Sequence, residues 1–378
     1  MFEPVRAMYA FRPKAAVGLI AASVAVASLF GATPFVLPEV AERYGVSLGA
    51  AGVISALQVG GFAASSFLAG RLLTPSRQVL VGSAAAALVA NLASAAVSVY
   101  GLLLALRLVA GVAAGLMTWL AWADSIGDRD RMADVAATGP VTAVLLAPLL
   151  GFLASIGDDR ALYLALAVTC VPALVLPAHP GLGAAAVVGP ARRSRSNRVL
   201  LVALALMTMA GSSFFVFASA FGQSHLEMSA LATSIGYSLN AAVGLVGTRT
   251  SPRSGSAGLW LLGPAAAVVI MVLVPNQFVW FATMAVWGGA FWLGVPEVFR
   301  LIASRTAAPD GQIGDAQAFM AVGRAIGPVV GGSVIAAHGY VTLGMLAGLG
   351  LTAAAGAVAV VEAYRRSRGR PAGFSASL

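Results

Sequence analysis

The chain has 378 residues, of which 59% are hydrophobic and only 10% are charged. Soluble domains usually carry about 25% charged residues, so this composition excludes a water-exposed globular surface. The net charge of +9 does not indicate a nucleic-acid partner, because the basic residues fall in short segments between long apolar runs. The single cysteine, Cys170, excludes an intrachain disulfide and a cysteine-based metal site.

Twelve apolar runs follow one another along the chain, each long enough to cross the hydrocarbon core of a bilayer. A chain in lipid must satisfy its backbone hydrogen bonds within each segment, so these runs are predicted to be helices. The runs span residues 15–37, 48–70, 79–98, 100–122, 135–156, 161–178, 199–221, 230–247, 258–275, 278–301, 314–337 and 340–362. The predicted fold is an all-α integral membrane protein with 12 transmembrane helices.

The distribution of arginine and lysine predicts the orientation of these helices, because cytoplasmic loops carry an excess of both. With the N-terminus in the cytoplasm, 19 of the 23 basic residues fall on the cytoplasmic side and two, Arg43 and Arg160, fall outside. A missed or extra helix would move every later loop to the other side and destroy this bias. We therefore expect a multi-pass protein of the cell membrane with both termini in the cytoplasm.

A segment rich in Gly, Pro and Ala at 179–198 divides the spans six and six and predicts a cytoplasmic linker. It separates an N-terminal six-helix bundle at 1–178 from a C-terminal six-helix bundle at 199–378, which ends in a short basic tail. The two bundles are therefore predicted to be separate domains.

The two halves also carry matching features in the same order. The segment Gly70–Arg77 follows span 2, and the similar segment Gly247–Arg253 follows span 8. The pair Pro148 and Gly151 of span 5 recurs 180 residues later in span 11. Internal repeats of this kind mark secondary transporters, whose substrate site lies between the halves near the middle of the bilayer. We therefore expect a pseudo-twofold relation between the bundles.

Glycine-rich segments carry a resemblance to a known family. Span 4 contains Arg107 followed by Gly111 and Gly115, and span 11 contains the pattern GxxxGPxxGG from Gly323 to Gly332. With the loop after span 2, these segments resemble motifs of the major facilitator superfamily, and the resemblance covers the whole chain. The pattern of span 11 is similar to one that the antiporters of that family carry in span 5.

The resemblance implies two six-helix bundles, alternating access, and a role in gating or helix packing for the motif residues. Small residues at a spacing of four let helices approach closely, and proline lets a membrane helix bend, so plain packing is the alternative explanation for each of them. The residues are Gly70, Arg77, Gly111, Gly115, Pro148, Gly151, Gly323, Gly327, Pro328 and Gly331.

Two arginines within the spans, Arg107 and Arg324, are candidates for substrate binding. A charge deep in the bilayer costs roughly 2.5–3.5 kcal/mol and usually faces a protein interior or a wet cavity. The alternatives are a structural tie between Arg107 and Asn91 or carbonyl groups, and snorkelling of Arg324 to the interface. Glu297, near the cytoplasmic end of span 10, is the candidate coupling residue and is placed to pair with Arg324. No carboxylate lies at the centre of a span, which favours an anionic or neutral substrate.

Other side chains in the middle of spans are candidates to line a substrate cavity. Gln58, Asn91 and Asn240 are polar, and Trp287 and Phe291 lie about one turn apart in the aromatic-rich span 10. Interhelical hydrogen bonds and ordinary packing are the alternatives for these five residues. Neither a metal nor a cofactor is expected, and the absence of a GxxxxGK[ST] motif excludes an ATP-driven pump.

These observations favour a secondary active transporter that moves a small organic solute by alternating access, with export preferred because of the resemblance to the efflux branch. An uptake permease or facilitator for a sugar, organic acid or other metabolite is the first alternative. A non-transporting membrane sensor would need a soluble output domain, and a membrane enzyme would need paired histidines or carboxylates. The expected partners are the bilayer, the substrate and, as a candidate coupling ion, the proton. Nucleic acid is not expected, and the chain is expected to be a monomer.

Overall fold

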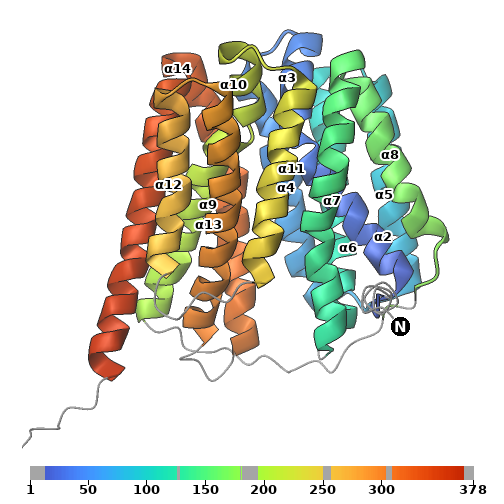
Figure 1. Cartoon of the computed structure of the whole chain (residues 1–378). Helices are drawn as coiled ribbons and strands as arrows, with labels where there is room; N and C mark the ends of the chain where they lie inside the picture. The colour runs from blue at the N-terminus through green and yellow to red at the C-terminus, as the bar shows by residue number, and fades with distance from the viewer. Residues whose placement is uncertain are drawn as a thin grey trace, which may run out of the picture.

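The regular structure is helical throughout the part of the chain that the computed structural model describes, which comprises residues 13–125, 128–178, 180, 195–249, 257–303 and 309–369. Figure 1 shows the helices standing side by side across one common thickness. In chain order they are α2 (Val17–Gly31), α3 (Thr33–Tyr44), α4 (Leu48–Leu72), α5 (Arg77–Ala96), α6 (Tyr100–Ser125), α7 (Arg129–Ile156), α8 (Asp159–Val175), α9 (Arg195–Phe215), α10 (Ala218–His225), α11 (Ala230–Arg249), α12 (Ala257–Leu273), α13 (Gln277–Ala303) and α14 (Pro309–Gly369).

These helices supply twelve membrane spans. By length and hydropathy, eight described segments can each cross a bilayer, with α9 and α10 counted together and α14 counted once, and the bent pair α2–α3 makes a ninth. The long α14 turns back at Gly339, whose φ of 79° suits a residue without a Cβ atom, so its two arms are separate spans. The 17-residue helices α8 and α12 complete the set. The predicted fold with 12 transmembrane helices is confirmed.

The first span of each half is broken in the same place, as the predicted repeat requires. The axes of α2 and α3 differ by 50° around Ala32, and the corresponding span of the second half is interrupted after Phe215, between α9 and α10. The next helix in each half then begins with the same cap. The hydroxyls of Ser47 and Ser229 each accept a hydrogen bond of 3.1 Å from the backbone N–H three residues later.

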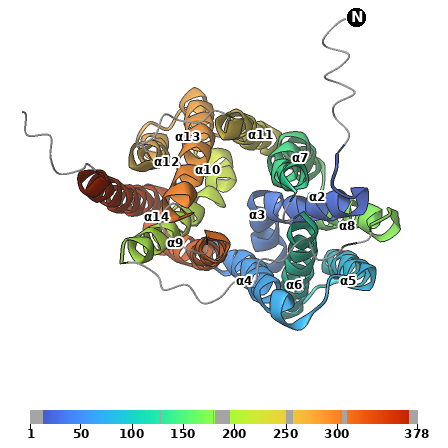
Figure 2. The same cartoon turned by 90° about the horizontal axis from the view of Figure 1, so that it is seen from below.

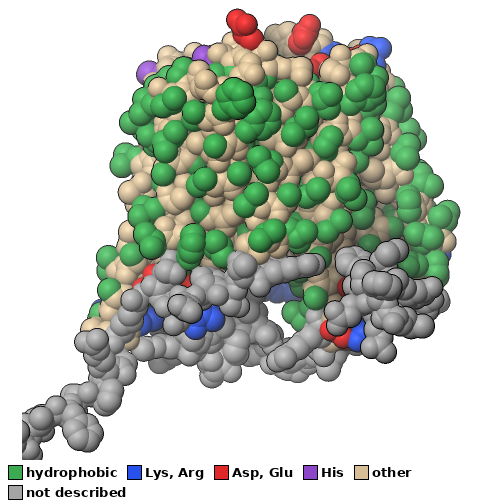
Figure 3. All heavy atoms as spheres, in the orientation of Figure 1, with side chains coloured by type: hydrophobic (Ala, Val, Ile, Leu, Met, Phe, Trp, Pro, Cys, Tyr) green, Lys and Arg blue, Asp and Glu red, His purple; other side chains and the backbone are tan. Residues whose placement is uncertain are grey.

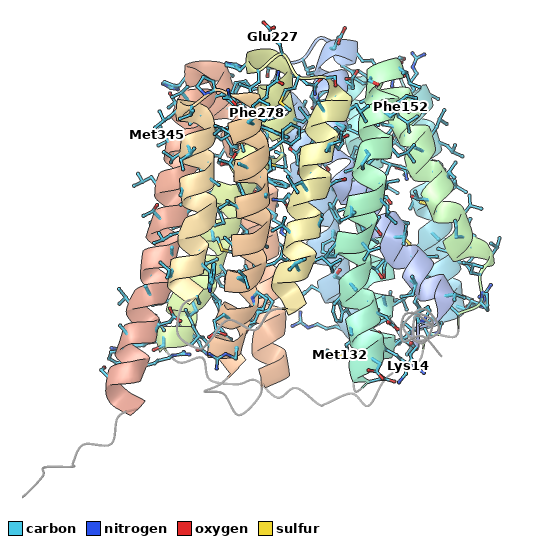
Figure 4. The ribbon with its side chains drawn as sticks, viewed as in Figure 1. Lys14, Met132, Phe152, Glu227, Phe278 and Met345 are labelled. Atoms are coloured by element: carbon cyan, nitrogen blue, oxygen red, sulfur yellow. The ribbon has the colours of Figure 1, made fainter. Side chains whose placement is uncertain are left out.

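The helices form two bundles around a common axis, α2–α8 on one side and α9–α14 on the other (Figure 2). Helix α4 packs on α14, and α7 packs on α11, so these two pairs join the bundles. We call the end of the molecule that holds Lys14 and Met132 the basal end, and the end that holds Glu227 and Phe278 the apical end (Figure 4). Most of the expected linker lies outside the described residues, and α9 begins at Arg195, four residues before the expected start of the second bundle.

The outer surface of the bundles is apolar around its middle. Leu145, Val168, Leu259 and Val360, on four different helices, are each 68–73% exposed. On the face drawn in Figure 3, the charged side chains gather at the apical and basal ends, and hydrophobic side chains cover the height between them. Contiguous apolar surface of this extent fits lipid rather than water.

A buried ion pair closes the apical end of the N-terminal bundle. Arg43, in the last turn of α3, donates to both carboxylate oxygens of Asp159, at 2.9 and 3.0 Å, and Asp159 is fully buried at the start of α8. The same guanidinium donates to the carbonyl oxygens of Ala95 and Val97 at the end of α5. These bonds tie three helices together and favour movement of this bundle as one body.

Candidate functional site

The seam between α4 and α14 is built from glycine in its apical half. A Cβ atom added to Gly332 would lie 2.3 Å from the Cα of Gly49, and one added to Gly52 would lie 2.8 Å from the carbonyl oxygen of Pro328. Non-bonded carbon atoms prefer separations of about 3.5–4.0 Å, so neither position has room for a side chain. The two bundles therefore touch backbone to backbone here.

The second seam, between α7 and α11, is also close in its apical half. A Cβ atom added to Gly151 would lie 2.2 Å from the hydroxyl oxygen of Ser234. The hydroxyl of Ser238 donates a hydrogen bond of 2.8 Å to the carbonyl of Val144 in the other bundle. Both seams thus hold the bundles together on the apical side.

Aromatic rings fill the space between the two seams. Tyr237 of α11 and Phe35 of α3 belong to opposite bundles and meet edge to face, with ring centroids 5.5 Å apart. Phe215 contacts Tyr237 at 5.0 Å and Trp287 at 5.4 Å. We call Phe35, Phe215, Tyr237 and Trp287 the aromatic roof. The hydroxyl of Tyr237 donates to the carbonyl of Phe215 and accepts from the N–H of Ser219, so it satisfies backbone groups freed by the break between α9 and α10.

Towards the basal end the α4–α14 seam opens. Gly60 follows Gly49 by eleven residues, which is about three helical turns, so the two glycines share one face of α4. A Cβ atom at Gly49 would lie 2.9 Å from the backbone of Gly332, whereas one at Gly60 would meet nothing within 4 Å. The bundles touch at Gly49 and leave room between them at Gly60, so we infer a cleft between the bundles that opens towards the basal end.

Arg324 lies on the face of α14 that borders this cleft. Its side chain is exposed although the residue is in the middle of the first arm, and it has no hydrogen bond or ion pair with the described residues. On the opposite side of the same arm, Val322, Ile326 and Val330 are 54%, 46% and 43% exposed and form the lipid-facing stripe. The exposure of Arg324 is therefore exposure to the cleft.

Arg107, by contrast, is enclosed within the N-terminal bundle and is 0% exposed. Its guanidinium donates to the side-chain oxygens of Asn91 at 3.0 Å and Ser94 at 2.6 Å, and to the carbonyl of Ala90 at 3.0 Å. It also lies over the ring of Tyr163, 4.6 Å from the centroid. This geometry favours the structural alternative for Arg107 and for Asn91, because the pair joins α5, α6 and α8 away from the cleft.

The remaining cavity candidates have different surroundings. Gln58 is 3% exposed and lies nine residues from Gly49, on the opposite face of α4, where its backbone packs against Gly111 of α6, so it faces the interior of its own bundle and not the cleft. Asn240 on α11 is half-buried and donates a hydrogen bond of 2.8 Å to the carbonyl of Met284 on α13, which is the interhelical alternative for this residue. Trp287 belongs to the aromatic roof, and Phe291 is half-buried one turn further along α13.

Glu297 does not form the ion pair with Arg324 that the sequence suggested. Its carboxylate binds Arg300 on its own helix instead, with an Nε–Oε2 distance of 2.8 Å and a second, shorter bond. The depths of the two residues explain the difference. Glu297 is six residues from the basal end of α13, and Arg324 is fifteen residues from the basal start of α14. Glu297 remains the candidate coupling residue, 7% exposed.

The motif glycines lie where helices touch. Added Cβ atoms at Gly323, Gly327 and Gly331 would lie 2.0–2.2 Å from oxygen atoms of α9. Added Cβ atoms at Gly111 and Gly115 would lie 2.2 and 2.0 Å from oxygen atoms of α4. The spacing of four in both motifs thus lets two helix backbones meet.

The other motif residues have looser surroundings. Arg77 donates to the carbonyls of Leu176 and Ala178, at 3.1 and 3.4 Å, and so ties the start of α5 to the chain that follows α8. A Cβ atom at Gly70 would make an ordinary contact of 3.5 Å with Trp119, and Pro148 is half-buried in α7.

Phe35 and Tyr237 are site residues that the sequence did not single out. Phe35 follows Pro34 in the first turn of α3, so the proline at the broken span was the available signal. No such signal marks Tyr237, whose role depends on a contact between bundles. Within the described parts of the chain, no three His, Cys, Asp or Glu side chains come together as they would around a metal ion.

Comparisons with known proteins agree with this architecture. Similar solved structures include a bacterial homologue of the human lysosomal transporter Spinster in an inward-facing, unoccupied conformation, with a TM-score of 0.69, 13% identity, and coverage of 96% of this chain and 97% of that one. The human organic anion transporter MFSD10 (TETRAN) has a TM-score of 0.63 and 15% identity, with 92% and 96% of the chains covered. A POT family transporter in complex with 5-aminolevulinic acid has a TM-score of 0.71 and 11% identity, with the same coverage.

No curated protein matches the sequence. The family model described as the Major Facilitator Superfamily matches residues 18–332, which is most of the chain. The matched residues include both glycine motifs, the N-terminal bundle, and the C-terminal bundle as far as Gly332 in the first arm of α14. The chain belongs to the major facilitator superfamily and is a membrane transport protein.

Proposed function

We propose that this transporter is secondary active, moves a small organic solute by alternating access, and exports it from the cytoplasm. The observation that carries the proposal is the asymmetry of the cleft. The bundles meet through backbone contacts on the apical side, separate towards the basal end, and leave the charged side chain of Arg324 in between. A binding site reached from one side at a time is the structural requirement for alternating access.

The bias of basic residues supports the assignment of the basal end to the cytoplasm, which is part of this proposal. On that assignment the cleft opens inward, which is the state that loads an exporter. The glycine–proline pattern from Gly323 to Gly332, which resembles that of antiporters, favours export over uptake. An importer would release its substrate from the same state, so the uptake permease is the alternative that transport measurements must separate.

The substrate site in this proposal lies under the aromatic roof, near the middle of the bilayer. Trp287 and Phe291 offer an apolar wall, and Arg324 offers a charge. Glu297 is the proposed proton carrier if transport is coupled to protons, because arginine does not deprotonate at ordinary pH. The chain is proposed to work as a monomer in the cell membrane.

Transport by the purified chain in lipid vesicles tests this function. A panel of radiolabelled organic acids, sugars and amines is offered from either side, with and without a pH gradient. The proposal expects substrate to accumulate on the apical side of the protein, and to do so more strongly when protons can move the other way. Accumulation on the basal side supports the uptake alternative, and no movement of any compound contradicts the transporter.

A further inference from the structure

Arg324 is a cation at the cleft that has no partner among the residues the structure describes. The guanidinium stays charged at ordinary pH and presents five N–H donors. No hydrogen bond or ion pair joins it to the described residues, although its side chain is exposed to the cleft. Its donors are therefore free for water or for a ligand.

The other arginine within the spans shows what a structural arginine looks like in this chain. Arg107 is 0% exposed and donates to three oxygen atoms of its own bundle. Arg324 is deep in the protein but has an exposed side chain, and it makes no such bonds to the described residues. An arginine that holds its own bundle together is expected to be buried and hydrogen-bonded, as Arg107 is. We therefore infer that Arg324 serves another purpose.

Depth excludes the interface as the partner of Arg324. The residue is midway along the first arm of α14, fifteen residues from both Pro309 and Gly339. The apolar stretch begins at Asp315, nine residues or about 13 Å of helix below Arg324, which is still more than the side chain can bridge. A charge held at this depth usually marks a substrate or ion pathway.

The two helices that pack on this arm of α14, α4 and α9, carry no acidic residue, and Asp315 of α14 lies nine residues further towards the basal end. The carboxylate of Glu297 binds Arg300. The field in this part of the cleft is therefore positive, which attracts an anion and repels a cation.

The surroundings of Arg324 define the rest of the ligand. Its neighbours Gly323 and Gly327 press against α9 at Met209 and Ser212. Phe215, in the aromatic roof, is about one turn further towards the apical end of α9. A ligand that reaches Arg324 thus places the remainder of its structure against apolar and aromatic side chains.

We propose that Arg324 is the anion-binding position of the transport site and that the substrate is a small organic acid, with a carboxylate on the guanidinium and an apolar or aromatic body under the roof. A planar carboxylate matches the guanidinium with two parallel hydrogen bonds. The inference rests on the proposed transport function and names the class of substrate for the same site.

Binding of matched probes to the purified full-length protein tests this assignment. The probes are 3-phenylpropionate, its neutral amide and the cationic 3-phenylpropylamine, which share one body and differ in charge. We expect only the acid to raise the Tm of the protein. Arg324→Gln should lower the affinity for the acid by about tenfold or more. Arg160→Gln, which removes an exposed arginine at the apical end, is the matched control and should leave binding unchanged.

Chemical rescue separates charge from shape. In Arg324→Cys, a cationic methanethiosulfonate should restore binding of 3-phenylpropionate and an anionic one should not, while buried Cys170 stays unlabelled. Equal binding of the three probes, acid binding that survives Arg324→Gln, no binding of the acid to the unaltered protein, or a cysteine at 324 that water-soluble reagents cannot reach would each overturn the assignment. In that case, transport of neutral or cationic compounds in the vesicle assay would still support the proposed transport function, with another class of substrate.

Discussion

The rings of Phe35 and Tyr237 meet edge to face at 5.5 Å, although one belongs to each bundle. Each residue is associated with the break in the first span of its own half. Phe35 is in the helix after the bend of α2–α3, and Tyr237 holds the backbone at Phe215 and Ser219. A contact between two repeated breaks gives the apical closure a single centre, and it explains why the cleft ends under aromatic side chains.

Replacing Tyr237 with Phe tests the hydroxyl at this centre. The variant keeps the ring contact and loses one bond donated to Phe215 and one accepted from Ser219. We expect a loss of stability of about 0.5–1.5 kcal/mol, measured by thermal unfolding in detergent. An unchanged Tm would show that the hydroxyl does not support the break.

Gly332→Ala tests the backbone seam. The added methyl group would lie 2.3 Å from Gly49, so the bundles cannot close apically as they do here. We expect the variant to favour the state that is open to the apical side, measured by faster labelling of a cysteine placed at Ser234. Gly82→Ala is the control, because it adds the same methyl group where nothing lies within 4 Å. The cysteine at Ser234 should then be labelled at the same rate as in the protein that keeps both glycines.

Arg107→Gln tests the assignment of Arg107 as a structural tie. The shorter side chain leaves at least one of the oxygens of Asn91, Ala90 and Ser94 without a donor in the bundle core. We expect a loss of about 1–3 kcal/mol in unfolding measurements, with probe binding retained in the molecules that fold. A stable variant that has lost probe binding would instead place Arg107 in the substrate site.

Glu297→Gln tests energy coupling. One charge that crosses 100 mV gains about 2.3 kcal/mol, and a carrier must bind and release the ion in turn to use it. If Glu297 carries the proton, the variant should lose uphill transport driven by a pH gradient and keep downhill exchange, both measured in vesicles. Continued accumulation against a gradient would remove Glu297 from the coupling step and favour another ion or a facilitator.

The orientation prediction has its own test. Met132 is 39% exposed near the basal end, and Phe278 is 84% exposed at the apical end (Figure 4). Cysteines at the two positions should react with impermeant reagents only from the cytoplasm and only from outside, respectively. Reaction from the same side would contradict the 12-span topology.

The sequence predicted the features that depend on one helix at a time. Apolar length located the spans, and the spacing of Gly323 and Gly327 predicted a close helix contact. It could not predict pairing between helices, because depth and rotation are set by packing. Glu297 was therefore matched with the wrong arginine, and Arg107 and Arg324 looked alike until the enclosure of one and the exposure of the other were known.

Two members of the aromatic roof, Phe35 and Tyr237, could not be found from the sequence for the same reason. Phe35 and Tyr237 are 202 positions apart, and although Pro34 marks the first of them, no pattern in the sequence links the two. Only the repeat, which breaks the first span of each half in the same place, brings them together. The repeat predicted a site between the halves, and Arg324, Trp287 and Phe291 of the proposed site were named from the sequence, whereas Phe35 and Tyr237 were not.

The most direct test of the account is reciprocal labelling at Gly60 and Ser234. In the structure Gly60 faces open space on the basal side of the cleft, and Ser234 is fully buried in the apical seam. Cysteines placed separately at these positions should therefore label fast from the cytoplasm at Gly60 and slowly from outside at Ser234. During turnover with a transported substrate, labelling should slow at Gly60 and accelerate at Ser234. If both rates rise together, or neither changes while substrate moves, alternating access between these two bundles is contradicted.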